Sequence, residues 1–72
     1  MYQRIRDLRE DSDMNQIEIA IKLNCSQQTY SNYELGLRTV PPEILISLAK
    51  IHNTSVDYLL GLTNVREPYP RA

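Results

Sequence analysis

The sequence predicts an all-α fold, a compact domain of five helices. Apolar residues recur at helical spacing in several segments, and no segment alternates apolar and polar residues as a strand would. Short polar, glycine or proline breaks separate these segments. The 72 residues, 42% of them hydrophobic, suffice for one small domain. We therefore expect one helical domain over residues 1–62 and an irregular C-terminal tail over residues 63–72.

The first two helices are predicted over Tyr2–Glu10 and Gln16–Leu23. A polar run at residues 11–13 separates them. Asn15 is a favourable N-cap, because its side-chain oxygen can accept from the free backbone N–H groups of the first turn. Asn24 tolerates a left-handed backbone conformation and can end the second helix.

The third helix is predicted over Gln27–Leu35, after Ser26 as its N-cap and before Gly36 as its C-terminal stop. On this helix Tyr30 and Tyr33 share one face. The opposite face carries short polar side chains. A helix with this pattern buries its aromatic face and exposes hydrogen-bonding groups.

Pro42 lies in the expected first turn of a fourth helix, where the missing N–H costs nothing. Ser55 caps a short fifth helix over Val56–Leu60. The fourth helix has a broad apolar surface made by Ile44, Leu45, Leu48, Ala49 and Ile51.

The order and spacing of these elements resemble the phage-repressor (Cro, XRE) type of helix-turn-helix DNA-binding domain family. The matching motifs are Gln16, Ala20, Ser26, Tyr33-Glu34-x-Gly36-x-Arg38, Leu48-Ala49-Lys50 and Val56-Asp57-Tyr58-Leu59-Leu60-Gly61. The resemblance runs from about Ile5 to Gly61. It implies a lambda-repressor-like fold and a sequence-specific transcriptional regulator, expected to be a repressor. Helix 26–35 would then insert into the major groove of a palindromic operator.

The resemblance places Gln27, Gln28 and Asn32 where base contacts are expected. A glutamine amide has a donor and an acceptor in one plane, which matches the N6/N7 edge of adenine. The alternative is that these side chains are only solvated polar residues. Contacts to the DNA backbone are expected from Gln16, Ser26, Thr29, Ser31 and Arg38. Gln16 starts a helix, where backbone N–H groups favour an anion, although it can also be an ordinary surface residue.

Other residues have structural interpretations. The resemblance pairs Arg9 with Glu34, which would orient the third helix without touching a base. Ile17 and Ile21 lie on a different stripe from the core residues of their helix, so they either pack under the connector or contact a protein. Near the C-terminus, the candidate apolar surface for dimerisation consists of Tyr58, Leu59, Leu62 and Tyr69.

Composition excludes several classes of protein. The single Cys25 rules out an internal disulfide and a Cys-rich zinc site, and a small buried residue is preferred to a redox thiol. His52 has no second His or Cys at metal spacing, so a structural role is preferred. No apolar run or leader segment indicates a membrane or secreted protein. We expect a cytoplasmic protein without metal, cofactor or small-molecule effector.

Charge modifies the functional prediction. The net charge of −1 and pI near 5.7 are not those of a strong nonspecific DNA binder. The acids cluster away from residues 27–32, which carry none. We expect a homodimer on double-stranded DNA whose specificity comes from neutral side chains. The alternative is an antitoxin-like or scaffold protein-interaction module of the same fold. No catalytic set or phosphate loop is present, so an enzyme is not expected.

Overall fold

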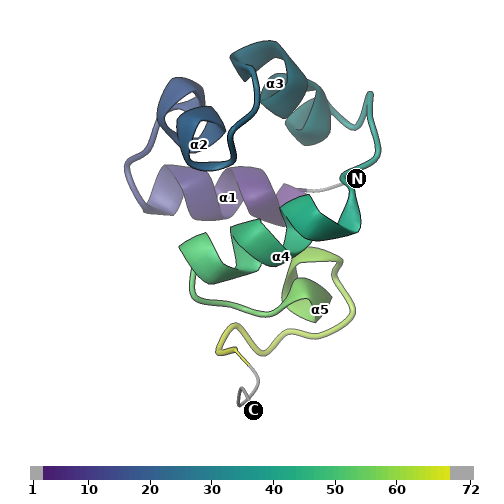
Figure 1. The fold of residues 1–72 in the computed structure, drawn as a ribbon. Coiled ribbons are helices and arrows are strands. Elements are labelled where there is room, and N and C mark those ends of the chain that lie inside the picture. Colours follow the sequence, from purple (N-terminus) through teal and green to yellow (C-terminus); the bar gives the residue numbers. More distant parts are fainter. Residues whose placement is uncertain (1–2, 69–72) are drawn as a thin grey trace.

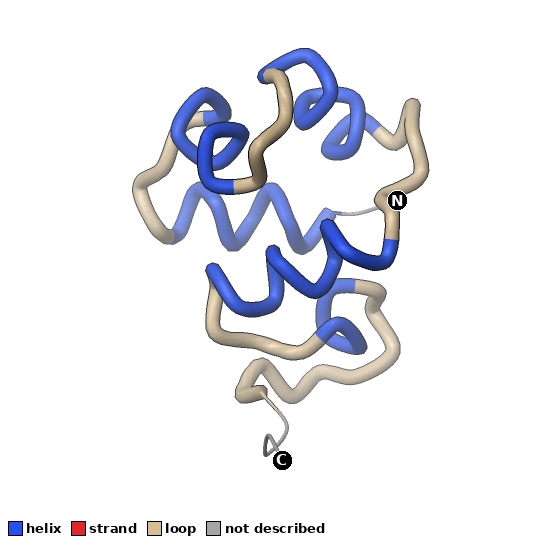
Figure 2. The backbone as a smooth tube through the Cα atoms, in the orientation of Figure 1, coloured by secondary structure: helices blue, strands red, loops and turns tan. Residues whose placement is uncertain are grey.

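The computed structural model describes residues 3–68, and these residues form five helices connected by short loops and no strand (Figures 1 and 2). The all-α prediction is confirmed. The helices are α1 (Gln3–Asp11), α2 (Gln16–Lys22), α3 (Gln27–Leu35), α4 (Pro42–Ile51) and α5 (Val56–Leu59).

The predicted bounds of α3 are confirmed, and those of α1, α2 and α5 differ from the observed bounds by single residues. Helix α1 continues to Asp11, and its predicted start at Tyr2 lies outside the described residues. Helices α2 and α5 end one residue earlier than predicted, because Leu23 and Leu60 are their C-cap residues. Residues 69–72, which include Tyr69, also lie outside the described part of the chain.

Helix α1 lies between two pairs of helices (Figure 1). Helices α2 and α3 pack against each other on one side, α4 and α5 on the other, and α1 contacts both α3 and α5. The core side chains come from all five helices and from two of the connections between them. They are Ile5, Leu8, Ile19, Ala20, Leu23, Tyr30, Tyr33, Val40, Leu45, Leu48, Ala49 and Leu59.

Side-chain caps begin three of the helices, as predicted. The Asn15 side chain accepts from the Glu18 backbone N–H over 2.8 Å, and Glu18 accepts in return from the Asn15 backbone N–H over 2.9 Å. This is a reciprocal capping box. Ser26 caps α3 and Ser55 caps α5. These bonds satisfy backbone donors that have no partner inside the helix.

Left-handed backbone conformations end the helices of the α2–α3 unit. Gly36 has a φ of 75° as the C-cap of α3, where a residue with a Cβ would be strained. Asn24 has a φ of 57°, in agreement with the prediction from its residue type. It follows the C-cap Leu23, so Asn24 reverses the chain after the helix has ended.

Arg4 attaches the segment after α5 to α1. Its guanidinium donates to the backbone carbonyl oxygens of Tyr58 over 2.9 Å and Thr63 over 2.5 Å, and to Asn64 Oδ1 over 3.0 Å. The same group lies 4.1 Å from the centre of the Tyr58 ring. One cation therefore connects positions that are almost the whole chain apart, a contact for which the sequence has no local signal.

His52 ends α4 and is buried, with 9% of its surface exposed. Neither ring nitrogen has a hydrogen-bond partner among the described residues. Burial lowers the pKa of the imidazole. In residues 3–68 no group of side chains is arranged to hold a metal ion, and no helix there is long and apolar enough to cross a membrane.

Candidate nucleic-acid interface

The α2–α3 unit forms one end of the molecule, and α4, α5 and the segment after α5 lie away from it (Figure 1). The small side chain of Ala20, 2% exposed, lies in the contact between α2 and the rest of the core. Cys25 in the turn is partly buried against this core, and burial raises the pKa of its thiol. A raised pKa disfavours the thiolate, which is consistent with the preferred packing role.

The inner face of α3 is buried. Tyr30 is 0% exposed and Tyr33 is 3% exposed. The Tyr30 hydroxyl has no hydrogen-bond partner of ordinary geometry among the described residues. Burial raises the pKa of this phenol, and the nearby Glu34 carboxylate raises it further. The aromatic face therefore anchors α3 by apolar packing rather than by polar contacts.

Glu34 is the centre of a hydrogen-bond network under α3. Arg9 donates from Nε to Glu34 Oε2 over 2.6 Å and from Nη2 to Oε1 over 3.1 Å. Gln16 Nε2 donates to the same Oε1 over 3.1 Å. The side chains of Arg9 and Glu34 are 12% and 4% exposed. The predicted pairing of these two residues is confirmed, and both carboxylate oxygens have partners.

The network also connects three segments of the chain. Arg9 comes from α1, Gln16 from the start of α2 and Glu34 from the end of α3, and Arg9 Nη1 additionally donates to the Met14 backbone carbonyl over 3.0 Å. Burial alone would raise the pKa of the Glu34 carboxyl, but the hydrogen bonds led by Arg9 outweigh burial and lower it. The Glu34 partner in turn raises the pKa of Arg9. Both groups are therefore charged at neutral pH, and they fix α3 relative to α1.

The outer face of α3 is polar and uncharged. Residues 23–33 contain no acidic or basic side chain. Gln27 and Gln28 are exposed, and Ser31 and Asn32 are partly exposed. The Gln28 amide donates from Nε2 to Asn32 Oδ1 over 3.1 Å. Gln28 and Asn32 thus lie on the side of α3 opposite its buried tyrosines, and Gln27 is exposed in the first turn.

Ser26 and Thr29 form a small hydrogen-bonded pair at the start of α3. The Ser26 hydroxyl accepts from the Thr29 backbone N–H over 3.1 Å and donates to Thr29 Oγ1 over 2.9 Å. The two hydroxyl groups share one hydrogen bond, so one of their two protons is left to donate to an incoming oxygen.

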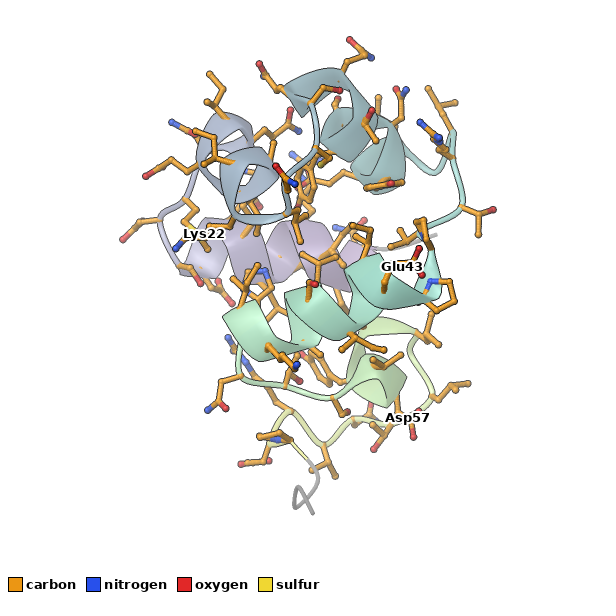
Figure 3. All side chains as sticks on the ribbon, viewed as in Figure 1. Lys22, Glu43 and Asp57 are labelled. Carbon is orange, nitrogen blue, oxygen red and sulfur yellow. The ribbon has the colours of Figure 1, made fainter. Side chains whose placement is uncertain are left out.

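The connector after α3 carries one cation among apolar residues. Arg38 is exposed, and Leu35 and Leu37 beside it are 60% and 73% exposed. Lys22, labelled in Figure 3, extends toward the side of the molecule away from α3. Arg38 is the basic side chain of this connector, and its exposure leaves it accessible to a phosphate.

Of the two alternatives for Ile17 and Ile21, packing under the connector is excluded, and part of the candidate dimer surface is buried. Ile17 and Ile21 are 53% and 72% exposed, so neither packs under the connector. Of the candidate dimer surface, Leu59 is buried and Tyr58 is partly covered by Arg4, because α5 turns this side inward. Leu62, 73% exposed, remains outside.

Sequence reasoning missed two local hydrogen bonds. Glu18 stands three residues after Asn15, a spacing that indicates a capping box. Gln28 and Asn32 stand four residues apart on a helix, a spacing at which amide side chains meet. The sequence carried both signals. By contrast, the bond from Gln16 to Glu34 spans two helices and has no such signal.

Comparisons with known proteins agree with this geometry. A helix-turn-helix family model matches residues 5–59. The uncharacterised HTH-type transcriptional regulator YobD of Bacillus subtilis is 36% identical over 94% of this chain and 62% of its own length. The HTH-type transcriptional regulator ImmR of the same organism is 37% identical over 86% of this chain and 49% of its own.

A third relative comes from a phage. The cryptic phage CTXphi transcriptional repressor RstR of Vibrio cholerae is 35% identical over 89% of this chain and 60% of its own length. The chain thus spans between 49% and 62% of these three relatives. No solved structure matches the chain significantly. On the family match and these relatives, the chain belongs to the phage-repressor type of the helix-turn-helix family.

Proposed function

We propose that this chain is a sequence-specific DNA-binding transcriptional regulator that acts as a repressor in the cytoplasm. In the proposed complex α3 enters the major groove, and Gln27, Gln28 and Asn32 meet base edges. The observation that carries the proposal is the contrast between the two faces of α3. Its outer face is an uncharged hydrogen-bonding surface, and its inner face is held by buried tyrosines and the Arg9–Glu34 pair.

The proposed backbone contacts surround this surface. The Ser26–Thr29 pair has one hydroxyl proton left to donate, and Arg38 supplies a positive charge. Gln16 gives one amide hydrogen to Glu34 and keeps a second for a phosphate oxygen. Ser31 is partly exposed on the outer side of α3. Ser26 is exposed and belongs to the same hydrogen-bonded pair as Thr29, so it stays among the proposed backbone contacts.

We further propose that two copies bind a palindromic operator as a homodimer. Two half-sites about 34–36 Å apart would each receive one α3. Part of the proposal is that residues 1–62 are the DNA-binding domain and residues 63–72 a tail. The relatives, which are named as transcriptional regulators and in one case as a phage repressor, support this function for the shared region.

A second candidate is a protein-interaction module of the same fold. The exposed Ile17 and Ile21 on α2 favour it, because aliphatic side chains 53% and 72% exposed on one helix can contact an apolar partner. The two candidates differ in their response to salt. Binding to DNA releases counterions and must weaken as salt rises, whereas apolar contact with a protein does not.

The experiment that tests the proposal is selection of bound sequences from a random duplex library, followed by a salt titration on the selected site. We expect a two-fold symmetric site and an affinity that falls steeply with salt. The low net charge predicts a moderate slope. A folded protein that enriches no sequence would overturn the regulator proposal and favour the protein-interaction module.

A further inference from the structure

Three amide side chains on the outer face of α3 are not equivalent. Gln28 Nε2 donates to Asn32 Oδ1 over 3.1 Å, across one turn of the helix. Gln27 makes no side-chain hydrogen bond to any described residue. The residues proposed to contact bases are therefore one linked pair and one independent side chain.

The direction of this bond decides which groups are left for DNA. An amide carries two N–H donors and one carbonyl acceptor. Gln28 uses one N–H, so it keeps its second N–H and its carbonyl oxygen. Asn32 accepts with one of the two lone pairs of its carbonyl oxygen, so it keeps two N–H donors and one lone pair. Gln28 thus presents a donor beside an acceptor, and Asn32 presents more donors than acceptors.

We propose that Gln28 and Asn32 recognise DNA bases as one unit, in which the hydrogen bond between them fixes which donors and acceptors each presents. This inference rests on the proposed function. Gln28 matches the N6/N7 edge of adenine. Asn32 donates to an acceptor edge, thymine O4 or guanine O6 and N7, in preference to the amino group of cytosine, because two donors and only one lone pair are free. Gln27 contacts its own base independently.

The two residues meet different base pairs. They are four residues apart, which is about 6 Å along the helix axis, whereas successive base pairs are about 3.4 Å apart. Their hydrogen bond makes each orientation depend on the other. Removing either side chain therefore relaxes the base preference at both positions, although each side chain touches only one of them.

A double-mutant cycle on the selected operator measures this dependence. We expect Gln28→Ala and Asn32→Ala each to weaken binding about tenfold, and the double variant about 20-fold instead of about 100-fold. The matched control pairs Gln27→Ala with Asn32→Ala, whose losses should multiply to about 100-fold. Thermal unfolding confirms that each variant is folded.

The variant Asn32→Asp tests whether Asn32 acts as a hydrogen-bond donor to its base. Aspartate keeps an oxygen that accepts from Gln28 but replaces the donating NH₂ with a second acceptor. Selection with this variant should retain adenine at the Gln28 position and change the Asn32 position to a base with a donor, with cytosine N4 favoured. In the free protein, Asn32→Ala should shift the side-chain amide NMR resonances of Gln28, whereas Gln27→Ala should leave them unchanged.

The outcomes distinguish a failure of the proposed function from a failure of this inference alone. If the wild-type protein selects no sequence, the proposed function is overturned and this inference with it. If the wild-type protein selects a site but the Gln28 and Asn32 losses multiply, or Asn32→Ala relaxes only one position, this inference alone is overturned. Losses that do not multiply, together with a base change limited to one position in Asn32→Asp, support it.

Discussion

Glu34 under α3 and His52 at the end of α4 are both buried titratable side chains, and they differ in their partners. Glu34 accepts hydrogen bonds at both oxygens from Arg9 and Gln16. His52 has no partner for either nitrogen among the described residues. The pKa of Glu34 is lowered because its charge is stabilised, and that of His52 is lowered because burial disfavours its charge.

The difference between the two groups indicates what fixes the orientation of the helices around each of them. A buried charge with directional partners fixes the orientation of the helices that supply them. A buried neutral ring contributes packing and leaves orientation to its apolar neighbours. The helix proposed to contact DNA is therefore the one held by directional bonds, which is the arrangement that a precise approach to base edges requires.

The largest expected effect comes from removing the partner of Glu34. Arg9→Ala leaves a buried carboxylate with an uncompensated charge, and we expect the free energy of unfolding to fall by about 3–5 kcal/mol. This is a large part of the stability of so small a domain. Denaturant unfolding measures the loss, and DNA binding should disappear through unfolding.

The matched control is Arg6→Ala on the same helix. Arg6 pairs with Glu10 over 3.5 Å, and the two side chains are 57% and 53% exposed. Such an exposed pair contributes only about 0.3–0.5 kcal/mol. Equal losses in the two variants would contradict the distinction between a buried partnered charge and a solvated one.

The burial of His52 and the lowered pKa of its ring predict that the free energy of unfolding depends on pH. The unfolded state takes up a proton near its ordinary pKa of about 6.5, while the buried ring in the folded state resists protonation. Stability is therefore fully present above that value and falls as pH decreases below it. The expected slope is up to about 1.4 kcal/mol per pH unit.

Thermal or denaturant unfolding between pH 7.5 and 5 measures this slope for the wild type and for His52→Leu. The variant cannot take up the proton, so its stability should be flat in this window. Glu34 contributes in the same direction at lower pH, because the stabilisation that accompanies its lowered pKa is lost as pH falls below the ordinary carboxyl range. An unchanged slope in His52→Leu would assign the pH dependence to another group.

The smallest expected effect on stability is at an exposed cation outside both buried groups. Arg38→Ala should change the free energy of unfolding by less than about 0.5 kcal/mol. Its proposed role is contact with a phosphate, so binding should weaken uniformly across sequences and the salt slope should decrease by about 1. Binding measured at several salt concentrations checks this, and a changed base preference would contradict it.

Residue chemistry alone predicted the fold to a large extent. Asn15, Ser26, Ser55 and Gly36 stand at helix ends for reasons that lie in each side chain or in the lack of one. The helix ends themselves shifted by one residue, as at Lys22 and Leu59, because an apolar residue can be the last helical residue or the cap with little difference in energy.

Long-range polar contacts were predicted less well. The Arg9–Glu34 pair was expected from the family resemblance and not from spacing, since 25 residues separate its members. The attachment of Arg4 to Thr63 and Asn64 was not expected at all, because tertiary packing alone brings these residues together. The residues on the outer face of α3 were placed correctly on the helix, and their contacts with DNA stay a prediction.

The most direct test of the central claim is the double variant Gln27→Ala with Gln28→Ala, studied by thermal unfolding and by selection from a random duplex library. Both side chains are exposed and outside the Glu34 network, so we expect an unchanged unfolding temperature. The variant lacks two amide side chains, each of which is expected to discriminate against a wrong base by about 1–3 kcal/mol. Site preference should therefore be lost, while weak salt-dependent binding to DNA remains. A double variant that still selects the wild-type site would contradict the claim that this face of α3 reads DNA sequence.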